Sequence, residues 1–383
     1  MPAPDPREPQ ADRQAPAPDE AWWPPVRLDE GPPNAATLLA LLRGEPPERW
    51  PAPESAQALL DLAVHHRLHL ELEHALAGAA PAAPAWAAAL EPELRAWKAH
   101  TRVEWVYKRE AAEAFGRELE RAGARALAFK GLALAWRVYP SPDRRAYGDL
   151  DLFVAPRERA LAEAALAACG FRAAPAPQPF GDFQKVFLKD TGHGVSLVVD
   201  LHWAFVSPET LVRSLRPDLE AILARGEAVA PGLIVPAAED ALLLAAVNLA
   251  RDGFAPLSHY LDVRYLLKQG VDWAALEVRV EAARTRTAMA LALNLGDSLL
   301  GLELPPEAAV LRRHVEWKRV LFQRLLRPAD TLTPGWNLAP RARYLLKVLA
   351  NDGLGSMLGA CMRMPLGLVR RWQHPHAVSA NLE

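Results

Sequence analysis

The chain has 383 residues, of which 51% are hydrophobic and 23% are charged, as in ordinary globular proteins, so wholesale disorder and a fibrous structure are excluded. Its 44 Lys and Arg against 46 Asp and Glu give a formal charge of −2, which argues against nucleic acid or an anionic membrane as the main partner. The two cysteines form no Cys-x-x-Cys pair, so neither a disulfide framework nor a zinc site is expected. Because no apolar run reaches the ~18 residues of a membrane span and the N-terminus lacks a signal-peptide pattern, we expect a soluble, cytoplasmic protein with no membrane partner.

The first two regions of the chain differ in proline content and in the spacing of apolar residues. Residues 1–34 are rich in Pro and Ala and poor in branched apolar side chains, a composition typical of a disordered tail. Residues 35–123 instead show apolar positions at helical spacing, interrupted by prolines between positions 46 and 53. This pattern predicts an N-terminal helical segment in which several short helices precede a long one that stops at Gly123.

The character of the sequence changes at Ala124, where short apolar runs begin to alternate with glycine turns and short helical patterns. A loop rich in turn residues occupies positions 139–148, and the next six residues alternate polar and apolar with the period of a half-buried strand. We therefore predict a small core of mixed strands and helices over residues 124–206. Its expected strands cover residues 124–129, 149–154, 183–188 and 195–203, and its expected helices cover residues 132–138 and 156–168.

The last part of the chain is predicted to be helical. From residue 208 the apolar spacing is that of helices almost to Arg371, with no fixed-period repeat, so residues 207–383 are expected to form a larger C-terminal helical region. The predicted fold class is α+β, with a small mixed sheet flanked by N-terminal helices and by this C-terminal region.

Three carboxylates are the strongest candidates for chemistry. Asp149 and Asp151 are separated by one residue on a predicted strand, so both side chains are expected on one face, with α-carbons about 6.6 Å apart. Asp200 ends the neighbouring predicted strand and would join them if the two strands pair. Adjacent carboxylates repel unless a cation or proton lies between them, and Mg²⁺ or Mn²⁺ prefers such oxygen ligands. Three acids can hold two metal ions about 3.5–4 Å apart, which supports in-line displacement at phosphorus.

Four further positions near these acids are candidates for nucleotide binding. Lys130 and Gly131 form a strand-to-helix turn, where backbone N–H groups favour an anion. Arg145 offers forked donors for a triphosphate, although arginines in proline-rich loops are more often solvated. His202 shares a strand face with Asp200, where it either serves the metal or nucleotide or is a hydrogen-bonded structural histidine.

The order of these motifs carries a resemblance to a known family. The motifs are Phe129-Lys-Gly, Tyr139-Pro, Arg145-x-x-x-Asp149-Leu-Asp-Leu, Gly170-Phe and Val199-Asp-Leu-His-Trp203, with weaker similarity at His65-His66-Arg67 and at Asp262. Over residues 35–300, the chain resembles the uncharacterised nucleotidyltransferase family of the polymerase-β-like nucleotidyltransferase superfamily. The resemblance implies that Asp149, Asp151 and Asp200 bind the metal and that Lys130 and Gly131 form the phosphate-side turn.

The resemblance implies metal-dependent transfer of a nucleoside monophosphate from an NTP donor to an acceptor, with release of pyrophosphate. The acceptor is open between a small molecule, a peptide and a protein; RNA is less favoured by the near-neutral charge, and DNA is not expected. The alternative is a catalytically silent binding or scaffold protein that keeps the fold. Leu132 favours this alternative slightly, because the superfamily usually has Gly or Ser at that position, whereas the three retained acids favour an enzyme.

Overall fold

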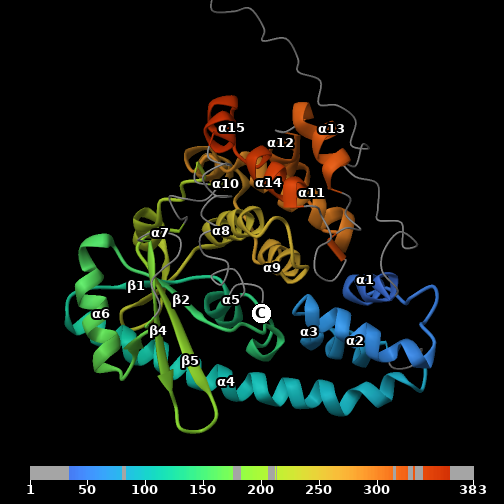
Figure 1. Ribbon diagram of the computed structural model, residues 1–383, viewed down its shortest axis with the longest axis horizontal. Coiled ribbons are helices and arrows are strands. Elements are labelled where there is room, and N and C mark those ends of the chain that lie inside the picture. The colour runs from blue at the N-terminus through green and yellow to red at the C-terminus, as the bar shows by residue number, and fades with distance from the viewer. Residues whose placement is uncertain are drawn as a thin grey trace, which may run out of the picture.

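The computed structural model describes residues 34–79, 83–175, 183–205, 212, 214–313, 316–326, 331–332 and 340–362. The tail predicted over residues 1–34 lies, apart from Asn34, outside these residues. They form a mixed β-sheet between layers of helices (Figure 1), which confirms the predicted α+β class. Every helix in this part of the chain is too short or too polar to cross a bilayer.

The N-terminal helices follow the predicted pattern. Pro53 begins a short 3₁₀ turn after the first helix, as expected for a residue that cannot continue a helix but fits its first turn. The long fourth helix buries Phe115 and Leu119 against the sheet, and Gly116 lies between them because a side chain there would clash with the carbonyl oxygen of Pro231. These helices are α1 (Ala35–Arg43), α2 (Ala56–His65), α3 (His69–Gly78) and α4 (Ala87–Arg121).

Among the described residues, seven strands form one sheet in the order β3-β4-β5-β2-β1-β7-β6. At its centre, β2 pairs parallel with β5 and antiparallel with β1. The strands are β1 (Ala126–Ala128), β2 (Leu150–Phe153), β3 (Arg172–Ala173), β4 (Gln184–Asp190), β5 (Ser196–His202), β6 (Glu227–Ala230) and β7 (Leu233–Val235). Two helices join strands within this order, α5 (Gly131–Arg137) and α6 (Arg159–Ala168).

The sheet extends beyond the core predicted from the sequence. Strands β6 and β7 lie in a region predicted to be helical throughout, and β7 pairs parallel with β1 at the centre of the fold. The helical prediction is wrong here because the two runs are only three or four residues long and too short to show a period of two. The signal missed was the Pro231-Gly232 turn between them, in which Gly232 has a φ of 66°.

The two faces of the sheet pack against different layers. Leu150, Leu152 and Val154 belong to an apolar cluster that includes side chains from α4 and α6. Phe153 projects to the opposite face and joins a second cluster with the C-terminal helices, which lie on the other side of the sheet from α4 (Figure 1). Because side chains alternate along a strand, Asp151 shares this second face with Phe153. The C-terminal helices are α7 (Leu219–Arg225), α8 (Ala238–Arg251), α9 (Ser258–Leu267), α10 (Trp273–Ala282), α11 (Arg286–Leu300), α12 (Ala309–Arg313), α13 (Glu316–Leu325), α14 (Pro340–Leu349) and α15 (Leu354–Cys361).

Candidate functional site

The register between β2 and β5 brings the predicted acids together. Asp151 pairs directly with Asp200, and the ligand atoms of Asp151, Asp200 and His202 all lie within 4.8 Å of one another. The predicted pairing of the two strands is therefore confirmed. Asp149 lies just before β2 and outside this group of three, and its role as a metal ligand stays a prediction. We call Asp149, Asp151 and Asp200 the carboxylate cluster.

Two basic side chains already contact Asp151. The ammonium of Lys130 forms an ion pair with Oδ1 of Asp151, and Nε2 of His202 lies 3.1 Å from the same oxygen. Lys130 has a φ of 53°, a rare conformation for a residue with a side chain, and it turns the chain from β1 directly into α5. Asp151 and His202 are both almost completely buried, so these contacts are shielded from water.

The charges of the carboxylate cluster shift the pKa values of its members in opposite directions. Burial raises the pKa of Asp151, but Lys130 and His202 outweigh burial and lower it to about 2. The charge of Asp151, together with burial, raises the pKa of Asp149. Burial and the two neighbouring carboxylates raise the pKa of Asp200 to about 7. Burial also lowers the pKa of His202 to about 4, so the imidazole is neutral at physiological pH.

These residues fit a divalent cation. Three carboxylates lie together and Lys130 pairs with one of them; burial first, and then the charges of Asp151 and Asp149, raise the pKa of Asp200. Carboxylate oxygens suit Mg²⁺ and Mn²⁺, and a neutral imidazole beside them can hold a ligating carboxylate in place. Nδ1 of His202 is buried and has no hydrogen-bond partner within the described residues. Asp151, Asp200 and His202 are therefore a possible metal site, with His202 added to the predicted set.

Gly131 is required by packing. It is the first residue of α5, and a Cβ atom on it would lie 2.5 Å from Cβ of Tyr147 in the loop that leads to Asp149. A distance below 3.0 Å between such carbons requires one of the two segments to move. The glycine therefore lets the loop pack directly on the Lys130-Gly131 turn.

Arg145 has different contacts from those predicted. Its Nε and Nη2 donate to the two carboxylate oxygens of Asp262 on α9, at 2.7 and 2.8 Å. The hydroxyl of Tyr139 donates to Asp262 as well, at 2.7 Å, and all three side chains are buried. The triphosphate contact was predicted from the forked donors of Arg145, and no signal in the sequence indicated Asp262, which lies 117 positions away. In this structure the forked donors of Arg145 bind the loop to α9.

Two arginines near the carboxylate cluster were not predicted from the residues. Burial lowers the pKa of Arg251, but the carboxylates of Asp252, Asp151 and Asp149 outweigh burial and raise it. Arg67, in the turn between α2 and α3, is exposed, has a φ of 58°, and its charge acts to lower the pKa of Asp149. For Arg67 the one available signal was the weak similarity at His65-His66-Arg67. Arg251 ends α8 and carries no local motif.

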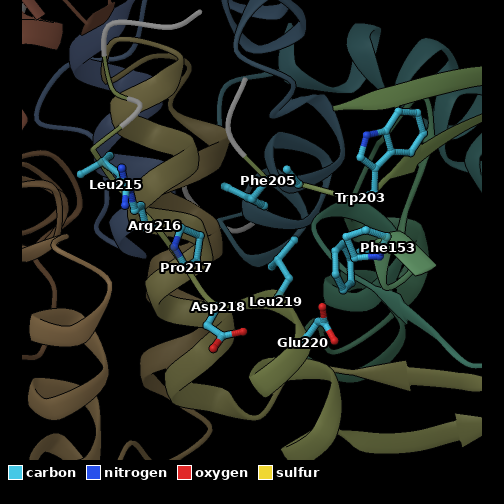
Figure 2. A pocket seen from close by; sticks show the side chains of 11 residues that line it. Phe153, Trp203, Phe205, Leu215, Arg216, Pro217, Asp218, Leu219 and Glu220 are labelled. Atoms are coloured by element: carbon cyan, nitrogen blue, oxygen red, sulfur yellow. The ribbon is translucent and has the colours of Figure 1, made fainter. Parts of the chain in front are cut away.

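A pocket of about 460 Å³ opens beyond the carboxyl ends of β2 and β5 (Figure 2). Phe205, one of its walls, has its ring centroid 5.4 Å from that of Phe129, which in turn lies 5.2 Å from the ring of His202. Phe205 therefore packs in one group of aromatic rings with Phe129 and His202. The lining of the pocket consists of Phe153, Pro156, Trp203, Ala204, Phe205 and the segment from Leu215 to Glu220.

Comparison with known protein families gives a match. The model of a family described as an uncharacterised nucleotidyltransferase matches residues 52–301, which is more than half of the chain. The matched range contains the carboxylate cluster, Lys130, His202 and all seven strands described above. A comparison with curated proteins gave no match.

Proposed function

We propose a reaction for this chain, which belongs to the uncharacterised nucleotidyltransferase family: metal-dependent transfer of a nucleoside monophosphate from an NTP to an acceptor, with release of pyrophosphate. The observation that carries the proposal is the direct pairing of Asp151 with Asp200 on parallel strands, with His202 beside them. Acids on two paired strands are held in a more precise geometry for a metal ion than acids on loops would be. The acceptor is a small molecule, a peptide or a protein.

In this proposal Asp151 and Asp200, with Asp149 at their edge, hold Mg²⁺ or Mn²⁺. A divalent cation bound there would neutralise charge that develops on the pyrophosphate leaving group. The oxygen of the acceptor hydroxyl forms a bond to the α-phosphorus while the bond from that phosphorus to pyrophosphate breaks. Asp200 accepts the hydroxyl proton. His202, neutral at physiological pH, orients Asp151 through the 3.1 Å contact.

The basic residues divide between holding phosphate and holding the loop. In the free protein, Lys130 neutralises Asp151, and we propose that it turns to the triphosphate when a divalent cation takes over that carboxylate. Arg67 and Arg251 lie close enough to act electrostatically on the same acids, so they add to the positive charge available for phosphate. We assign Arg145 a positioning role, because Asp262 uses its forked donors.

Calorimetric titration with each NTP in the presence of Mg²⁺ tests the proposal. Wild-type protein is expected to bind an NTP only when Mg²⁺ is present, and to release pyrophosphate once an acceptor is supplied. An Asp149→Asn/Asp151→Asn double variant is expected to lose both properties while remaining folded. Asp61→Asn is the matched control, since Asp61 is exposed on α2 and contacts Gln57. Full turnover in the double variant would contradict the proposed mechanism.

The same titration separates the enzyme from a silent protein of the same fold. A specific observation keeps that alternative in view, because the ammonium of Lys130 already neutralises the acid that a metal would need. A silent protein would bind nucleotide without Mg²⁺ and would release no pyrophosphate with any acceptor. Mg²⁺-dependent release that is abolished in the double variant would exclude it.

A further inference from the structure

Charge is distributed unevenly along the chain. Residues 309–383, from the start of α12 to the last residue, contain 12 Lys and Arg against 4 Asp and Glu, a formal charge of +8. The other 308 residues therefore carry −10, and the total of −2 conceals this asymmetry. After Asp352 the next acidic residue is Glu383. The basic region lies beyond residues 52–301, the range that matches the nucleotidyltransferase family, so the proposed reaction does not account for it.

The helix α15 presents an apolar face to solvent. Leu354 and Leu358 are each 66% exposed, and Met362, directly after the helix, is 79% exposed. Because the three are four positions apart, they share one face, while Met357 and Ala360 on the other side are buried. The helix itself contains no charged residue. An apolar face of this kind is typical of a surface that binds another molecule.

The helices around α15 expose further aliphatic side chains and arginines. In Figure 1, α13 and α15 lie at the end of the molecule opposite to α4, and α14 packs against both of them. Val320 and Leu321 on α13 are 55% and 43% exposed, and Leu345 on α14 is 39% exposed. Arg313 at the end of α12 and Arg324 on α13 are exposed as well. The α12–α15 end of the molecule therefore combines apolar and cationic surface.

We propose that the α12–α15 end binds the surface of an anionic lipid membrane, with the apolar face of α15 entering the interface. Basic side chains are attracted to anionic headgroups, and exposed aliphatic side chains gain free energy when they leave water for acyl chains. Residues 363–372, which follow α15, read Arg-Met-Pro-Leu-Gly-Leu-Val-Arg-Arg-Trp, a mixture of apolar side chains, arginine and tryptophan that is typical of interfacial segments. The total charge, from which no membrane partner was expected, does not describe this region.

Lipid fits these residues better than a nucleic acid does. Both ligands attract positive charge, but surfaces that bind single-stranded nucleic acid combine it with aromatic rings that stack on bases. Within the described part of α12–α15, the large apolar side chains that are exposed have no aromatic ring, and such side chains cannot stack on a base. Acyl chains, in contrast, accept them readily. They are Val310, Val320, Leu321, Leu345, Leu354, Leu358 and Met362.

The test is co-sedimentation of the full chain with lipid vesicles. Vesicles of phosphatidylcholine with phosphatidylglycerol are compared with vesicles of phosphatidylcholine alone, in low and in high salt. Leu354→Gln/Leu358→Gln removes the apolar face and keeps good helix formers on α15. Val103→Gln/Val106→Gln is its matched control, because both valines are 49% exposed on α4, at the opposite end of the molecule. Circular dichroism and thermal unfolding establish that each variant is folded.

A second pair of variants tests the charge. Arg370→Gln/Arg371→Gln removes two of the basic residues that follow α15, and Arg95→Gln/Arg109→Gln on α4 is the matched control, since both of those arginines are exposed. These variants are compared on the same two kinds of vesicle.

The wild-type protein is expected to bind the anionic vesicles about tenfold or more tightly than the neutral ones, and high salt is expected to weaken that preference. The leucine variant and the arginine variant are each expected to lower the affinity for anionic vesicles about tenfold or more, and their controls to leave it unchanged.

Three results would overturn the inference, and none of them bears on the proposed function. The first is vesicle binding that a folded leucine variant retains in full, or that shows no preference for anionic lipid. The second is binding to single-stranded RNA, in place of vesicles, that the arginine variant loses and the leucine variant keeps. The third is a dimer in sedimentation velocity that the leucine variant abolishes, without vesicle binding by the wild type, which would make a second copy of the chain the partner of α15.

Discussion

The protein buries charge at two neighbouring places that differ in how the charge is balanced. In the network between the loop and α9, Asp262 is matched by the guanidinium of Arg145 and by the hydroxyl of Tyr139. In the carboxylate cluster, Lys130 forms an ion pair with Asp151, whereas Asp149 and Asp200 have no ion pair with a basic side chain among the described residues. Burial raises the pKa of Asp262, but the charge of Arg145 outweighs burial and the pKa falls. By contrast, the pKa of Asp200 rises to about 7.

The difference separates a structural arrangement from a binding arrangement. A buried pair with all its hydrogen bonds made is complete, and removing one partner leaves an uncompensated charge. A buried group with excess charge is costly until a ligand of opposite charge arrives, and such groups concentrate at functional sites. We therefore expect substitutions in the network to lower stability and substitutions in the carboxylate cluster to lower activity.

The sharpest separation is expected for Asp200→Asn. Loss of one ligand of the cation removes charge stabilisation of the transition state, and we expect pyrophosphate release to fall on the order of 1,000-fold, or about 4 kcal/mol. The melting temperature of the metal-free variant is expected to equal or exceed that of wild type, because one of three repelling acids is gone. Turnover assays and thermal unfolding in EDTA measure the two effects. A strong fall in melting temperature would show that Asp200 is structural, like Asp262.

For Asp262→Asn we expect a loss of stability. The substitution removes the carboxylate and leaves the guanidinium of Arg145 buried without a matching charge, which is expected to cost about 3–5 kcal/mol of unfolding free energy. Asp297→Asn is the matched control, because Asp297 also pairs with an arginine, at 2.6 Å, but at a partly exposed site where such pairs contribute about 1 kcal/mol or less. Urea unfolding measures both changes. Equal effects of the two variants would show that the buried pair stabilises the fold no more than the partly exposed pair does.

Addition of Mg²⁺ is expected to stabilise the protein through the carboxylate cluster alone. At a concentration about 100 times Kd, binding to the folded state adds about 3 kcal/mol to the unfolding free energy. The gain is expected to disappear in Asp200→Asn and to persist in Asp297→Asn. Thermal unfolding over a series of Mg²⁺ concentrations gives this result directly. A gain that persists in Asp200→Asn would place the metal elsewhere.

The carboxylate cluster was easier to predict from the sequence than the other contacts of the site, because each strand carries its own pattern of alternating side chains. Alternation along a strand sets which face Asp151 and Asp200 share, and the pairing of two apolar strands then brings them together. His202 follows from the same alternation. Gly131 was predicted at the right turn for a different reason, since its lack of a side chain admits Tyr147.

The residues that sequence analysis missed are those brought together by tertiary structure. Arg145 meets Asp262 across 117 positions, and Arg251 approaches the acids only because α8 packs on the same face of the sheet. Strands β6 and β7 were missed because pairing with β1, and not their own length or pattern, makes them strands. Each case depends on a contact that has no local signal.

The smallest expected effect concerns a third kind of buried group, a histidine whose ring contacts backbone groups. His66 is buried between the backbone N–H of Leu257, which donates to Nδ1 at 3.4 Å, and the carbonyl of Leu332, 3.1 Å from Nε2. These contacts fit the neutral ring, in which Nε2 carries the proton, and burial lowers its pKa to about 4. The unfolded chain has the ordinary value of about 6.5, so it binds the proton first as the pH falls.

The stability that neutral His66 confers is therefore fully present above pH 6.5 and is lost as the pH falls from there toward 4. Between pH 7.5 and 5.5 we expect a loss of about 1 kcal/mol that His66→Gln abolishes, measured by urea unfolding at both values. His65→Gln is the matched control, because the ring of His65 is exposed whereas the ring of His66 is buried. If the slope is unchanged in His66→Gln, the buried ring does not take up a proton on unfolding. The contacts of His66 with the backbone then do not hold the ring in its neutral form.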